Sequence, residues 1–447
     1  MTGAPDIDVS RVKSLILDTL GAPGDGPWFA AYSGGLDSTV LLHLLARVCR
    51  EEGIRLIALH ADHGLHRASG DWRRHCRARC SEWGIELRSA ELDVADEEGL
   101  GPEGAARAAR YRWFRQDAGE GAWLFTAHHR GDQAETVIER LTRGAGPRGL
   151  RGILPLTRLH DMWLVRPLLD HPRDAIRAYA ERHQLAWVSD HSNLDTYFSR
   201  NYIRSRVLPA LAERWPAVEA SLGQSARVMA DAQRILDEEA ASDLQRLRER
   251  RVRGDPCLEV AALREMSPER RRNALRHWIA GETGVSLGYS RIARIERAVE
   301  QWPADIGGLN WPPVELRLYH GDLYLLRKAE SPADVESWDL ESSLRLGPGL
   351  VLRPREAVGR GLRKSAVAAG VRVAFRRGGE KCRLPGRAHH HSLKNILQEA
   401  GVPPWQRPRM PLVLVGDAVA AIPGVTACEP WAAGPGETGI EIEAVYH

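Results

Sequence analysis

The chain has 447 residues, of which 43% are hydrophobic and 27% charged, with a formal net charge of +3. This length predicts two or three domains, and the composition is typical of globular proteins, which excludes the fibrous and disordered classes. The opening MTGAPDIDVSRVK has no basic segment followed by an apolar one, and no apolar run reaches the roughly 18 residues that span a bilayer. We therefore expect a cytoplasmic protein with no membrane partner.

The six cysteines are scattered along the chain. They predict reduced, buried thiols rather than a disulfide framework. Cys76-x3-Cys80 lacks the second ligand pair that a structural zinc site needs, so the spacing does not indicate a metal.

The basic residues are unevenly placed. Between residues 360 and 410 there are twelve Arg or Lys against two Glu, whereas residues 411–447 carry five acidic residues and no Arg or Lys. Such a basic stripe favours a polyanion, of which nucleic acid is the commonest. A solvated surface in an arginine-rich chain is the alternative, and composition alone leaves both open.

Strand-like and helix-like segments alternate in the first 143 residues. Short apolar or alternating runs predict strands at 28–32, 56–60, 86–92 and 123–127, and helical spacing predicts helices at 39–52, 71–83, 104–118 and 132–143. This order predicts an α/β domain with a mainly parallel sheet. Ligands of such sheets bind beyond the carboxyl ends of the strands, so we expect the chemistry in the polar residues that follow each strand.

The rest of the chain divides into a closing segment and two further regions. Residues 166–211 are expected to complete the first domain, residues 216–300 are helical and rich in Arg and Glu, and residues 329–337 have the composition of a linker. The predicted domains are therefore 1–215, a mainly helical 216–336 and a small α+β domain at 337–447. Later strands are expected at 315–319, 323–326, 371–375 and 412–416, and a later helix at 392–400.

The turn between the first strand and the first helix reads SGGLDS, residues 33–38. The chain contains no Gly-Lys pair, which excludes the Gly-Lys-Ser/Thr phosphate loop, and the turn lacks the Gly-x-Gly-x-x-Gly dinucleotide fingerprint. Two glycines and two serine hydroxyls at a helix start nevertheless form a nest for an anion. Because Asp37 would repel phosphates unless a divalent cation lay between them, the turn predicts a site for phosphates with Mg²⁺.

The same turn allows a rival interpretation. Ala31-x-Ser33-x-Gly35 resembles a variant of the hydrolase nucleophile elbow, in which a strained turn raises a serine for attack. That interpretation leaves Asp37 and Ser38 without a role, so the phosphate site is favoured.

SGGLDS, after a strand and at the start of a helix, resembles the pyrophosphatase-loop motif of the N-type ATP pyrophosphatases, which cleave ATP to AMP and pyrophosphate. Further motifs follow in order over nearly the whole chain and together resemble the tRNA(Ile)-lysidine synthetase family in its long, three-domain form. They are HADHGLH (60–66), EGAARAARYRWF (103–114), TAHHRGDQAET (126–136), RGAGPRGLRGI (143–153), RPLLD (166–170), SRNYIR (199–204), RRNALRHWI (271–279) and the segment from GVRVAF (370–375) to RMPLV (409–413). The resemblance implies a parallel-sheet fold of the adenine-nucleotide alpha-hydrolase type in a catalytic domain at 1–215, followed by two tRNA-binding domains.

The family joins the side-chain amine of free L-lysine to C2 of the wobble cytidine in tRNA(Ile) with a CAU anticodon. ATP adenylates the cytidine oxygen, AMP becomes the leaving group, and the lysine nitrogen displaces it. The modified base pairs with adenine instead of guanine, which changes codon reading from AUG to AUA. The resemblance implies that ATP is bound by Ser33, Gly34, Gly35, Leu36, Asp37 and Ser38, with Asp37 also holding Mg²⁺ and acting in catalysis.

Asp132 and Glu135 lie three residues apart at a predicted helix start, hence on one face of the helix. They match the family positions that recognise lysine. Two carboxylates suit its ammonium group, and one can take the proton that the attacking nitrogen loses. Helix capping is the alternative role, and both roles can hold at once. The family usually has an acid where this chain has Gly131, which leaves its activity open on that point.

Two further residues are implied near the reaction centre. Arg107 matches a family arginine that offsets charge developing on the α-phosphate, and Arg110 is the other choice. His128 and His129 end the fourth strand at the carboxyl edge of the sheet, where a role near the nucleotide is expected, and His128 is the candidate for catalysis. His60, His63 and His66 have a spacing that could suggest a metal, but the resemblance assigns that loop to the nucleotide side.

Contacts with RNA are expected outside the ATP and lysine sites. Arg200, Arg204 and Arg206, beyond the loop that carries Asp190, Asn193 and Asp195, are candidates for binding the anticodon arm. In the basic stripe, the candidates for the acceptor stem or neighbouring backbone are Arg376, Arg377 and Lys394. Whether the chain forms a homodimer stays open.

Two other classes of protein compete with this interpretation. A sulfur-inserting tRNA enzyme of the same superfamily, of the 2-thiocytidine type, would need cysteines poised for persulfide or iron-sulfur chemistry. The cysteines of this chain lie inside helical segments or far apart in sequence. A catalytically silent RNA-binding protein would have no use for Asp37, Asp132 and Glu135.

Overall fold

A computed structural model of the chain describes residues 7–20, 26–62, 69–93, 101–188, 199–303, 309–326, 334–347, 349–368 and 370–446. The chain forms two compact units, Met1–Ile235 and Leu236–His447. The predicted domain boundaries after residues 215 and 336 stay predictions.

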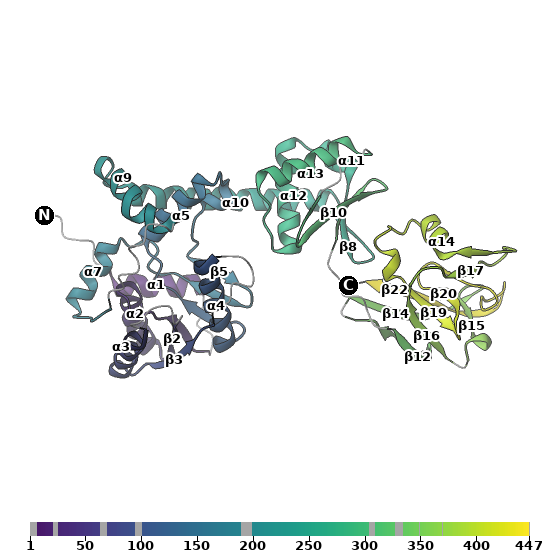
Figure 1. Cartoon of the computed structure of the whole chain (residues 1–447), viewed down its shortest axis with the longest axis horizontal. Coiled ribbons are helices and arrows are strands. Elements are labelled where there is room, and N and C mark those ends of the chain that lie inside the picture. The colour runs from purple at the N-terminus through teal and green to yellow at the C-terminus, as the bar shows by residue number, and fades with distance from the viewer. Residues whose placement is uncertain are drawn as a thin grey trace. The chain divides into compact units, whose positions relative to one another are not determined.

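A six-stranded sheet in the order β3-β2-β1-β4-β6-β5 forms the centre of the first unit (Figure 1). Neighbouring strands are parallel except for the edge pair β5 and β6, which is antiparallel. This confirms the predicted α/β class, and the predicted strands and helices lie within a few residues of the observed ones. In chain order the elements are α1 (Val9–Leu20), β1 (Trp28–Ala31), α2 (Leu36–Glu52), β2 (Leu56–Asp62), α3 (Ser69–Glu82), β3 (Glu86–Glu91), α4 (Gly101–Ala118), β4 (Trp123–Phe125), α5 (Arg130–Thr142), α6 (Pro147–Leu150), β5 (Leu156–Leu159), β6 (Met162–Val165), α7 (Arg173–Arg182), α8 (Ser199–Tyr202), the π-helical turn η2 (Ile203–Val207) and α9 (Leu208–Arg214).

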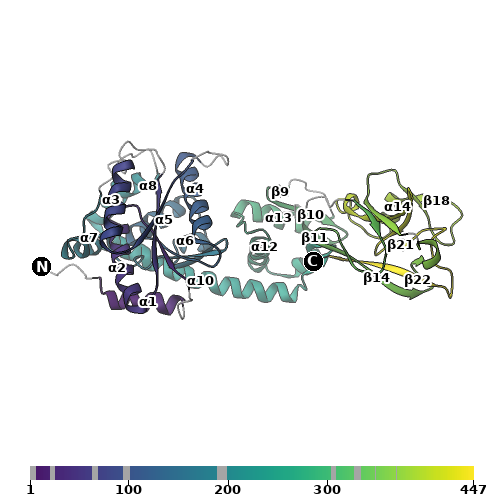
Figure 2. The same cartoon turned by 90° about the horizontal axis from the view of Figure 1, so that it is seen from below.

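Helices cover both faces of this sheet (Figure 2). On one face α1, α2 and α7 pack in a core that includes Leu41 and Tyr179. On the other face α4 contributes Phe114 to a smaller core with Phe29 and Leu124. Because both faces are covered, β1 is apolar along its length, as buried parallel strands are.

The strand order reverses between β1 and β4. β1 leads through α2 to β2 on one side, whereas β4 lies on its other side. The crevice at such a reversal is where parallel sheets bind ligands. The fold therefore brings the residues after β1 (33–38) and those after β4 (126–135) to neighbouring strand ends.

The first half of the second unit packs helices against an antiparallel sheet, β7-β8-β11-β10-β9. Its core includes Leu258, Trp278, Ile292 and Leu325. The sequence predicts the helices, β10 and β11 but not β7 and β8, because the hairpin RRVRGDPCLE (250–259) shows little apolar alternation. The elements are α10 (Val218–Arg246), which begins in the first unit, β7 (Arg250–Val252), β8 (Asp255–Glu259), α11 (Val260–Glu265), α12 (Pro268–Thr283), α13 (Tyr289–Gln301), β9 (Asn310–Trp311), β10 (Val314–Tyr319) and β11 (Asp322–Leu326).

The second half of that unit is richer in strands than the sequence predicts. Two sheets, β12-β16-β19-β20-β21 and β13-β14-β22-β15, enclose a core with Leu352, Val373, Val413 and Ile442. A two-stranded hairpin, β17-β18, leads into the predicted helix. The elements are β12 (Val335–Trp338), which takes up the end of the predicted linker, β13 (Leu344–Arg345), β14 (Leu350–Val358), β15 (Leu362–Arg363), β16 (Val371–Phe375), β17 (Lys381–Arg383), β18 (His390–Ser392), α14 (Leu393–Glu399), β19 (Pro411–Val415), β20 (Ala418–Ile422), β21 (Thr426–Ala427) and β22 (Thr438–Tyr446).

Cys382 and Cys428 form a disulfide in this half, with their Cα atoms 5.8 Å apart. The prediction that all six cysteines are reduced thiols is therefore wrong for this pair. The two residues are 46 positions apart in sequence, and they meet because Arg383 and Glu429 form a β-bridge beside them. The other cysteines, Cys49, Cys76, Cys80 and Cys257, are free and buried as expected.

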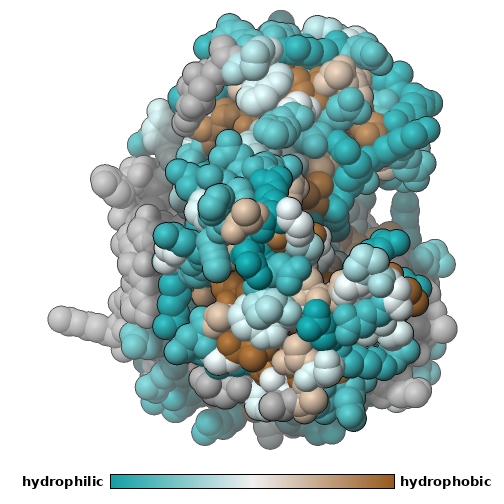
Figure 3. Space-filling view, turned by 90° about the vertical axis from the view of Figure 1, so that its right-hand side faces the viewer, coloured by the Kyte–Doolittle hydropathy of each residue, from teal (hydrophilic) through white to brown (hydrophobic). Residues whose placement is uncertain are grey.

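The surface is polar where it is seen in Figure 3, with hydrophobic residues scattered between hydrophilic ones. Scattered apolar side chains are normal on a protein surface. Within the described ranges, no helix is both long enough and apolar enough to cross a membrane.

Candidate active site

The chain turns through residues 33–38 from β1 into α2. Gly34 has a φ of 83°, which glycine adopts without strain, and a Cβ there would lie 2.9 Å from Sγ of Cys76. The hydroxyls of Ser33 and Ser38 lie 2.9 Å apart, and Ser38 also donates to the carbonyl of Gly35 at 3.0 Å. The N-cap of α2 is Gly35, which has no side chain to cap the helix, while the backbone N–H groups of Ser33 and Gly35 donate to the Ser38 and Ser33 hydroxyls. The turn therefore leaves backbone amides at a positive helix end, as an anion site requires.

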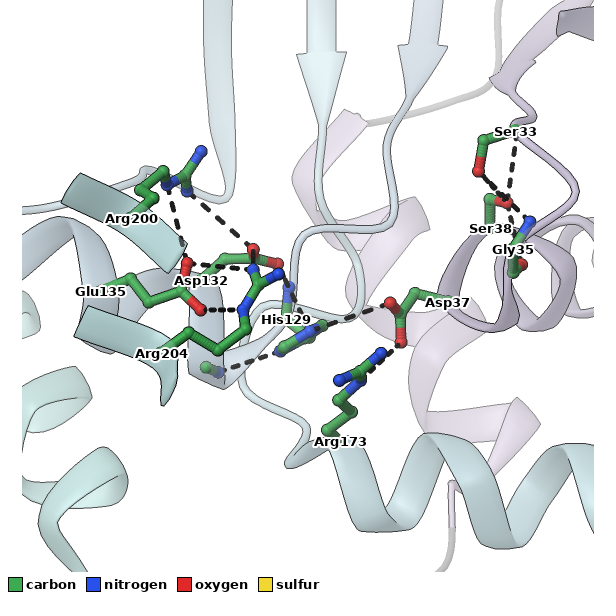
Figure 4. A network of polar contacts seen from close by, with 11 residues as sticks. Ser33, Gly35, Asp37, Ser38, His129, Asp132, Glu135, Arg173, Arg200 and Arg204 are labelled. Atoms are coloured by element: carbon green, nitrogen blue, oxygen red, sulfur yellow. Dashed lines mark hydrogen bonds and ion pairs between the residues drawn. The ribbon is translucent and has the colours of Figure 1, made fainter. Parts of the chain in front are cut away.

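Asp37 lies in the first turn of α2, and its Oδ1 atom is buried yet accepts no hydrogen bond from the described part of the chain. Its charged neighbours are Arg173 of α7, with Nε 3.8 Å from Oδ1, and His129, with Nε2 4.0 Å from Oδ2 (Figure 4). A buried carboxylate oxygen without a partner is costly, and a divalent cation would satisfy it.

The residues of this turn fit an Mg²⁺ ion that is bound by one carboxylate together with phosphates of the substrate. Mg²⁺ in nucleotide sites is bound by one or two carboxylates together with substrate phosphates. No group of three or more His, Cys, Asp or Glu that could hold a metal occurs among the described residues. Asp37 alone, beside the loop, is the arrangement that substrate phosphates would complete.

His129 lies between the two acidic parts of the site. Its Nδ1 accepts a hydrogen bond from the backbone N–H of Gly131 at 3.0 Å, so in the neutral ring Nε2 carries the proton. Nε2 faces Oδ2 of Asp132 at 3.6 Å and Oδ2 of Asp37 at 4.0 Å (Figure 4). The sequence predicts both histidines near the nucleotide, and the structure places His129 in this bridging position.

His128 lies beside the site in a neutral state. The hydroxyl of Thr126 is 2.9 Å from its Nδ1. Burial, helped by the charges of Arg166 and Arg107, lowers the pKa of His128 to about 3, although Asp132 acts to raise this pKa. The imidazole is therefore uncharged at neutral pH.

Gly131 is what lets the His129 ring fold back over the start of α5. A Cβ at residue 131 would lie 2.8 Å from Cε1 and 3.1 Å from Nδ1 of His129. Such contacts are too close to persist, so a side chain here would move the ring. Gly131, which stands where the family usually has an acidic residue, therefore leaves room for the His129 ring at the start of α5.

Asp132 and Glu135 lie on one face of α5, as predicted. Asp132 accepts a hydrogen bond from the backbone N–H of His129 at 2.9 Å and completes a capping box, so the capping role is present. Glu135 is 1% exposed, and Arg204 donates to both of its oxygens, at 2.6 and 3.0 Å. Arg200 approaches the same carboxylate, with Nε 3.6 Å from Oε2 (Figure 4). The acid pair therefore already binds cations, supplied by α8 and η2.

The two carboxyl groups differ in their readiness to hold a proton. Burial raises the pKa of Glu135, against the opposing effect of Arg204. Burial also acts to raise the pKa of Asp132, but His129, His128, the backbone N–H of His129 and Arg200 together lower this pKa below its ordinary value. Glu135 is therefore the better proton acceptor from a bound ammonium group, and Asp132 the more permanent charge.

The two arginines predicted near the reaction centre, Arg107 and Arg110, lie on the same helix and differ in exposure. Arg107 is exposed, and its guanidinium lies 5.0 Å from the centre of the Tyr111 ring. Its charge acts to lower the pKa of His128. Arg110 is partly buried on the same helix.

The predicted RNA contacts lie in three different settings. Arg200 and Arg204 face the acid pair, whereas Arg206 is exposed. In the second unit Arg376 approaches Glu380 at 3.5 Å and Arg377 pairs with Asp334 at 2.6 Å, while Lys394 is exposed on α14 with no ion pair among the described residues. His63, His66, Asp190, Asn193 and Asp195 lie outside the described residues. His60 is 2.9 Å from the carbonyl of Tyr32, a structural contact.

The sequence predicts His129 near the nucleotide but not its position between Asp37 and Asp132. It does not predict Arg173 or the inward direction of Arg200 and Arg204. Arg173 and Arg204 act across the fold, and nothing in their local sequence indicates their partners.

Three family models match the chain. They are the PP-loop domain over residues 9–211, the TilS substrate binding domain over 258–324 and the TilS substrate C-terminal domain over 371–444. Among solved structures, the U34-tRNA thiolase NcsA from Methanococcus maripaludis is 20% identical over 50% of this chain and 80% of its own, with a TM-score of 0.40. That likeness is too low to bear on function.

Curated relatives named tRNA(Ile)-lysidine synthase match over nearly the whole length. The protein from Coxiella burnetii is 38% identical, covering 92% of this chain and 92% of its own. Those from Xanthomonas campestris and Pseudomonas fluorescens are 38% and 39% identical and cover 93% and 96% of this chain. The sulfur-inserting alternative is the weaker fit, also because burial raises the pKa of the Cys76 thiol to about 12, too high for a reactive thiolate. The chain belongs to the tRNA(Ile)-lysidine synthase family of enzymes.

Proposed function

We propose that this chain joins L-lysine to C2 of the wobble cytidine of tRNA(Ile) with a CAU anticodon, and that it uses ATP with Mg²⁺ to adenylate that cytidine. The observation that carries the proposal is the pairing of two sites at one crevice. A phosphate loop with an unsatisfied carboxylate, Asp37, lies across His129 from a carboxylate pair that binds guanidinium groups.

The loop end supplies the energy of the reaction. The amides at the start of α2 and the hydroxyls of Ser33 and Ser38 bind ATP phosphates. Mg²⁺, when bound to Asp37, supplies charge neutralisation between this carboxylate and the phosphates. The cytidine oxygen attacks the α-phosphorus, and pyrophosphate leaves.

The acid pair supplies the lysine. Its ammonium group takes the place that the guanidinium of Arg204 holds between Glu135 and Asp132. Glu135, whose pKa burial raises, accepts a proton and frees the nitrogen lone pair for attack at C2. The C2–O bond then breaks, and the oxygen leaves with AMP. His129 lies between the carboxylates of Asp37 and Asp132, with Nε2 4.0 and 3.6 Å from them, and separates the two ends of the site.

The test measures two products of the proposed reaction, the tRNA that carries lysine and the released AMP. With isotope-labelled L-lysine, purified enzyme, ATP and Mg²⁺, we expect label in a CAU-anticodon isoleucine tRNA and release of one AMP per lysine incorporated. Omission of Mg²⁺ should stop both. Release of ADP, or incorporation that does not need ATP, would contradict the proposal.

A parallel reaction addresses the sulfur-inserting alternative. The same tRNA is incubated with ATP and a sulfide donor in place of lysine. We expect no thiolated nucleoside after digestion of the tRNA, and its formation would favour the alternative.

A further inference from the structure

A short loop of the second unit, VPPWQRPR at residues 402–409, contacts the antiparallel sheet of the same unit. We call it the WQ loop. It follows α14 and ends in the 3₁₀ turn Arg407–Arg409. Nε of Arg407 donates to the carbonyl of Val402 at 2.9 Å, and the backbone N–H of Gln406 donates to the carbonyl of Pro403 at 3.0 Å. These internal bonds give the loop a defined shape before it meets the sheet.

The loop binds one carboxylate at the start of β8. Nε2 of Gln406 donates to Oδ2 of Asp255 at 2.7 Å and to the carbonyl of Val252 at 2.8 Å, and Nε1 of Trp405 donates to the same Oδ2 at 3.2 Å. Asp255 is 6% exposed and Gln406 is 5% exposed. Both partners of the Gln406 NH₂ group are acceptors, so the orientation of this amide is fixed.

The Trp405 ring adds an apolar contact to these hydrogen bonds. Its centre lies 5.3 Å from the ring of Tyr324 and 5.7 Å from that of Tyr319, both edge-on. The guanidinium of Arg317 lies 5.5 Å from the centre of the Trp405 ring. Aromatic pairs and cation–π contacts of this geometry stabilise an interface beyond the area that they bury.

The aromatic residues on the two sides of this contact belong to different matched regions, and Asp255 lies just before the first of them. Tyr319 and Tyr324 lie in the stretch matched by the substrate binding domain, residues 258–324, and Trp405 and Gln406 lie in the stretch matched by the C-terminal domain, residues 371–444. The two regions are therefore joined twice, once by the covalent chain between them and once by this buried polar contact.

We propose that Trp405, Gln406 and Asp255 form a lock that holds the two tRNA-binding regions of the second unit at one fixed spacing. They are positioning residues, since the side-chain N–H groups of Trp405 and Gln406 donate to Asp255. If the two binding regions moved freely relative to each other, binding one tRNA to both would restrict that motion and cost entropy. Regions that are already held together lose little freedom when tRNA binds. The inference rests on the proposed function for its substrate, but the lock itself is independent of it.

The test uses full-length protein with Trp405→Ala and Asp255→Asn, and with Gln398→Ala as the control. Gln398 is an exposed glutamine on α14 of the same region and is not among the buried residues of that helix. We expect the lock variants to raise KM for full-length tRNA about tenfold with kcat nearly unchanged, equivalent to about 1.4 kcal/mol of binding. The control should behave as the unmodified enzyme.

Two further readouts separate a lock from a general loss of structure. Trp405→Phe keeps the ring contacts and loses one hydrogen bond, so its KM should lie between those of the unmodified enzyme and Trp405→Ala. Small-angle X-ray scattering without tRNA should give a broader distance distribution for the Asp255→Asn protein than for the Gln398→Ala protein. Identical scattering, or a fall in kcat with KM unchanged, would overturn the lock. Scattering that broadens in an enzyme that incorporates no lysine would keep the lock and reject the proposed function.

Discussion

The loop end and the acid-pair end of the crevice differ in how their charges are satisfied. Oδ1 of Asp37 is buried without a hydrogen-bond partner among the described residues, whereas Glu135 accepts two hydrogen bonds from Arg204. The two ends are therefore prepared for their ligands in opposite ways. At the loop end Asp37 has the distant charge of Arg173, 3.8 Å from Oδ1, whereas at the other end a hydrogen-bonded Arg204 must be displaced by lysine.

This difference has an energetic consequence for each ligand. A bidentate arginine–carboxylate pair is among the stronger polar contacts in proteins, so lysine gains only the difference between its own contacts and those of Arg204. Metal and phosphates at Asp37 compete with Arg173, which at 3.8 Å makes no hydrogen bond to Oδ1, and they satisfy an oxygen that is otherwise costly to bury. We therefore expect substitutions at the loop end to affect the chemistry most.

Asp37→Ala should have the largest effect. Without the carboxylate, charge on the phosphates is no longer neutralised, and we expect AMP release to fall by about 10³-fold, the upper range for loss of one electrostatic group. Binding of tRNA and the melting temperature should change little, because Oδ1 of Asp37 makes no hydrogen bond within the described chain. A variant as active as the unmodified enzyme would remove Asp37 from the site.

Glu135→Gln should act on lysine rather than on ATP. The glutamine keeps the shape of the side chain and loses the charge that binds an ammonium group. We expect KM for lysine to rise by about 10- to 100-fold, or about 1.4–2.8 kcal/mol, with KM for ATP unchanged. Steady-state kinetics with each substrate varied in turn measure this, and an unchanged lysine KM would reject the acid pair as the lysine site.

Arg204→Met tests the same ion pair through its pH dependence. Burial already raises the pKa of Glu135, and loss of the guanidinium should raise this pKa further. Because the folded protein then holds a proton that the unfolded chain has lost, stability falls as pH rises above about 4.5 through the folded pKa. We expect the variant to melt close to the unmodified protein at pH 4 and well below it at pH 7.

The size of that loss is set by exposure. Removing one partner of a fully buried pair costs about 3–5 kcal/mol, but the Arg204 side chain is 37% exposed, so we expect about 1–3 kcal/mol at pH 7. A deficit that is equal at both pH values would show that the pair contributes packing and not charge.

Gly131→Ala should show whether His129 matters for helix stability, as the cap of α5, or for activity, through its position between Asp37 and Asp132. Alanine in a helix is normally more stable than glycine by about 1 kcal/mol, but the displaced His129 ring gives up a cap worth about the same. We therefore expect little change in melting temperature and a several-fold fall in kcat. Gly223→Ala on α10 is the matched control, because a Cβ there meets nothing within 4 Å. Equal activity in both variants would leave His129 without a role.

Lys394→Ala should have the smallest effect. If this exposed lysine contacts a phosphate, its loss should weaken the binding of every tRNA to a similar extent. The slope of log Kd against log salt concentration should then fall by about 0.7–0.9. Arg377→Ala is the comparison, since Asp334 already pairs with Arg377. Titrations at several salt concentrations decide between a phosphate contact and a solvated lysine.

The sequence predicts those parts of the site that depend on local pattern. The strand and helix around SGGLDS, and the helix that carries Asp132 and Glu135, follow from apolar periodicity and from residue types at a helix start. The contact of Arg204 with Glu135 joins residues 69 positions apart, and the disulfide of Cys382 joins residues 46 apart. Such pairings are set by the topology of the whole fold, and the resemblance to a family does not state them either.

The most direct test of the two-ended site is adenylation without lysine. Enzyme, Mg²⁺, α-³²P-labelled ATP and the CAU-anticodon tRNA are mixed, and label retained on the tRNA is measured for the unmodified protein, Asp37→Ala and Glu135→Gln. The account predicts that Glu135→Gln still labels the tRNA to the level of the unmodified enzyme, whereas Asp37→Ala does not. Loss of label in both variants, or in neither, would contradict a division of the crevice into an ATP end and a lysine end.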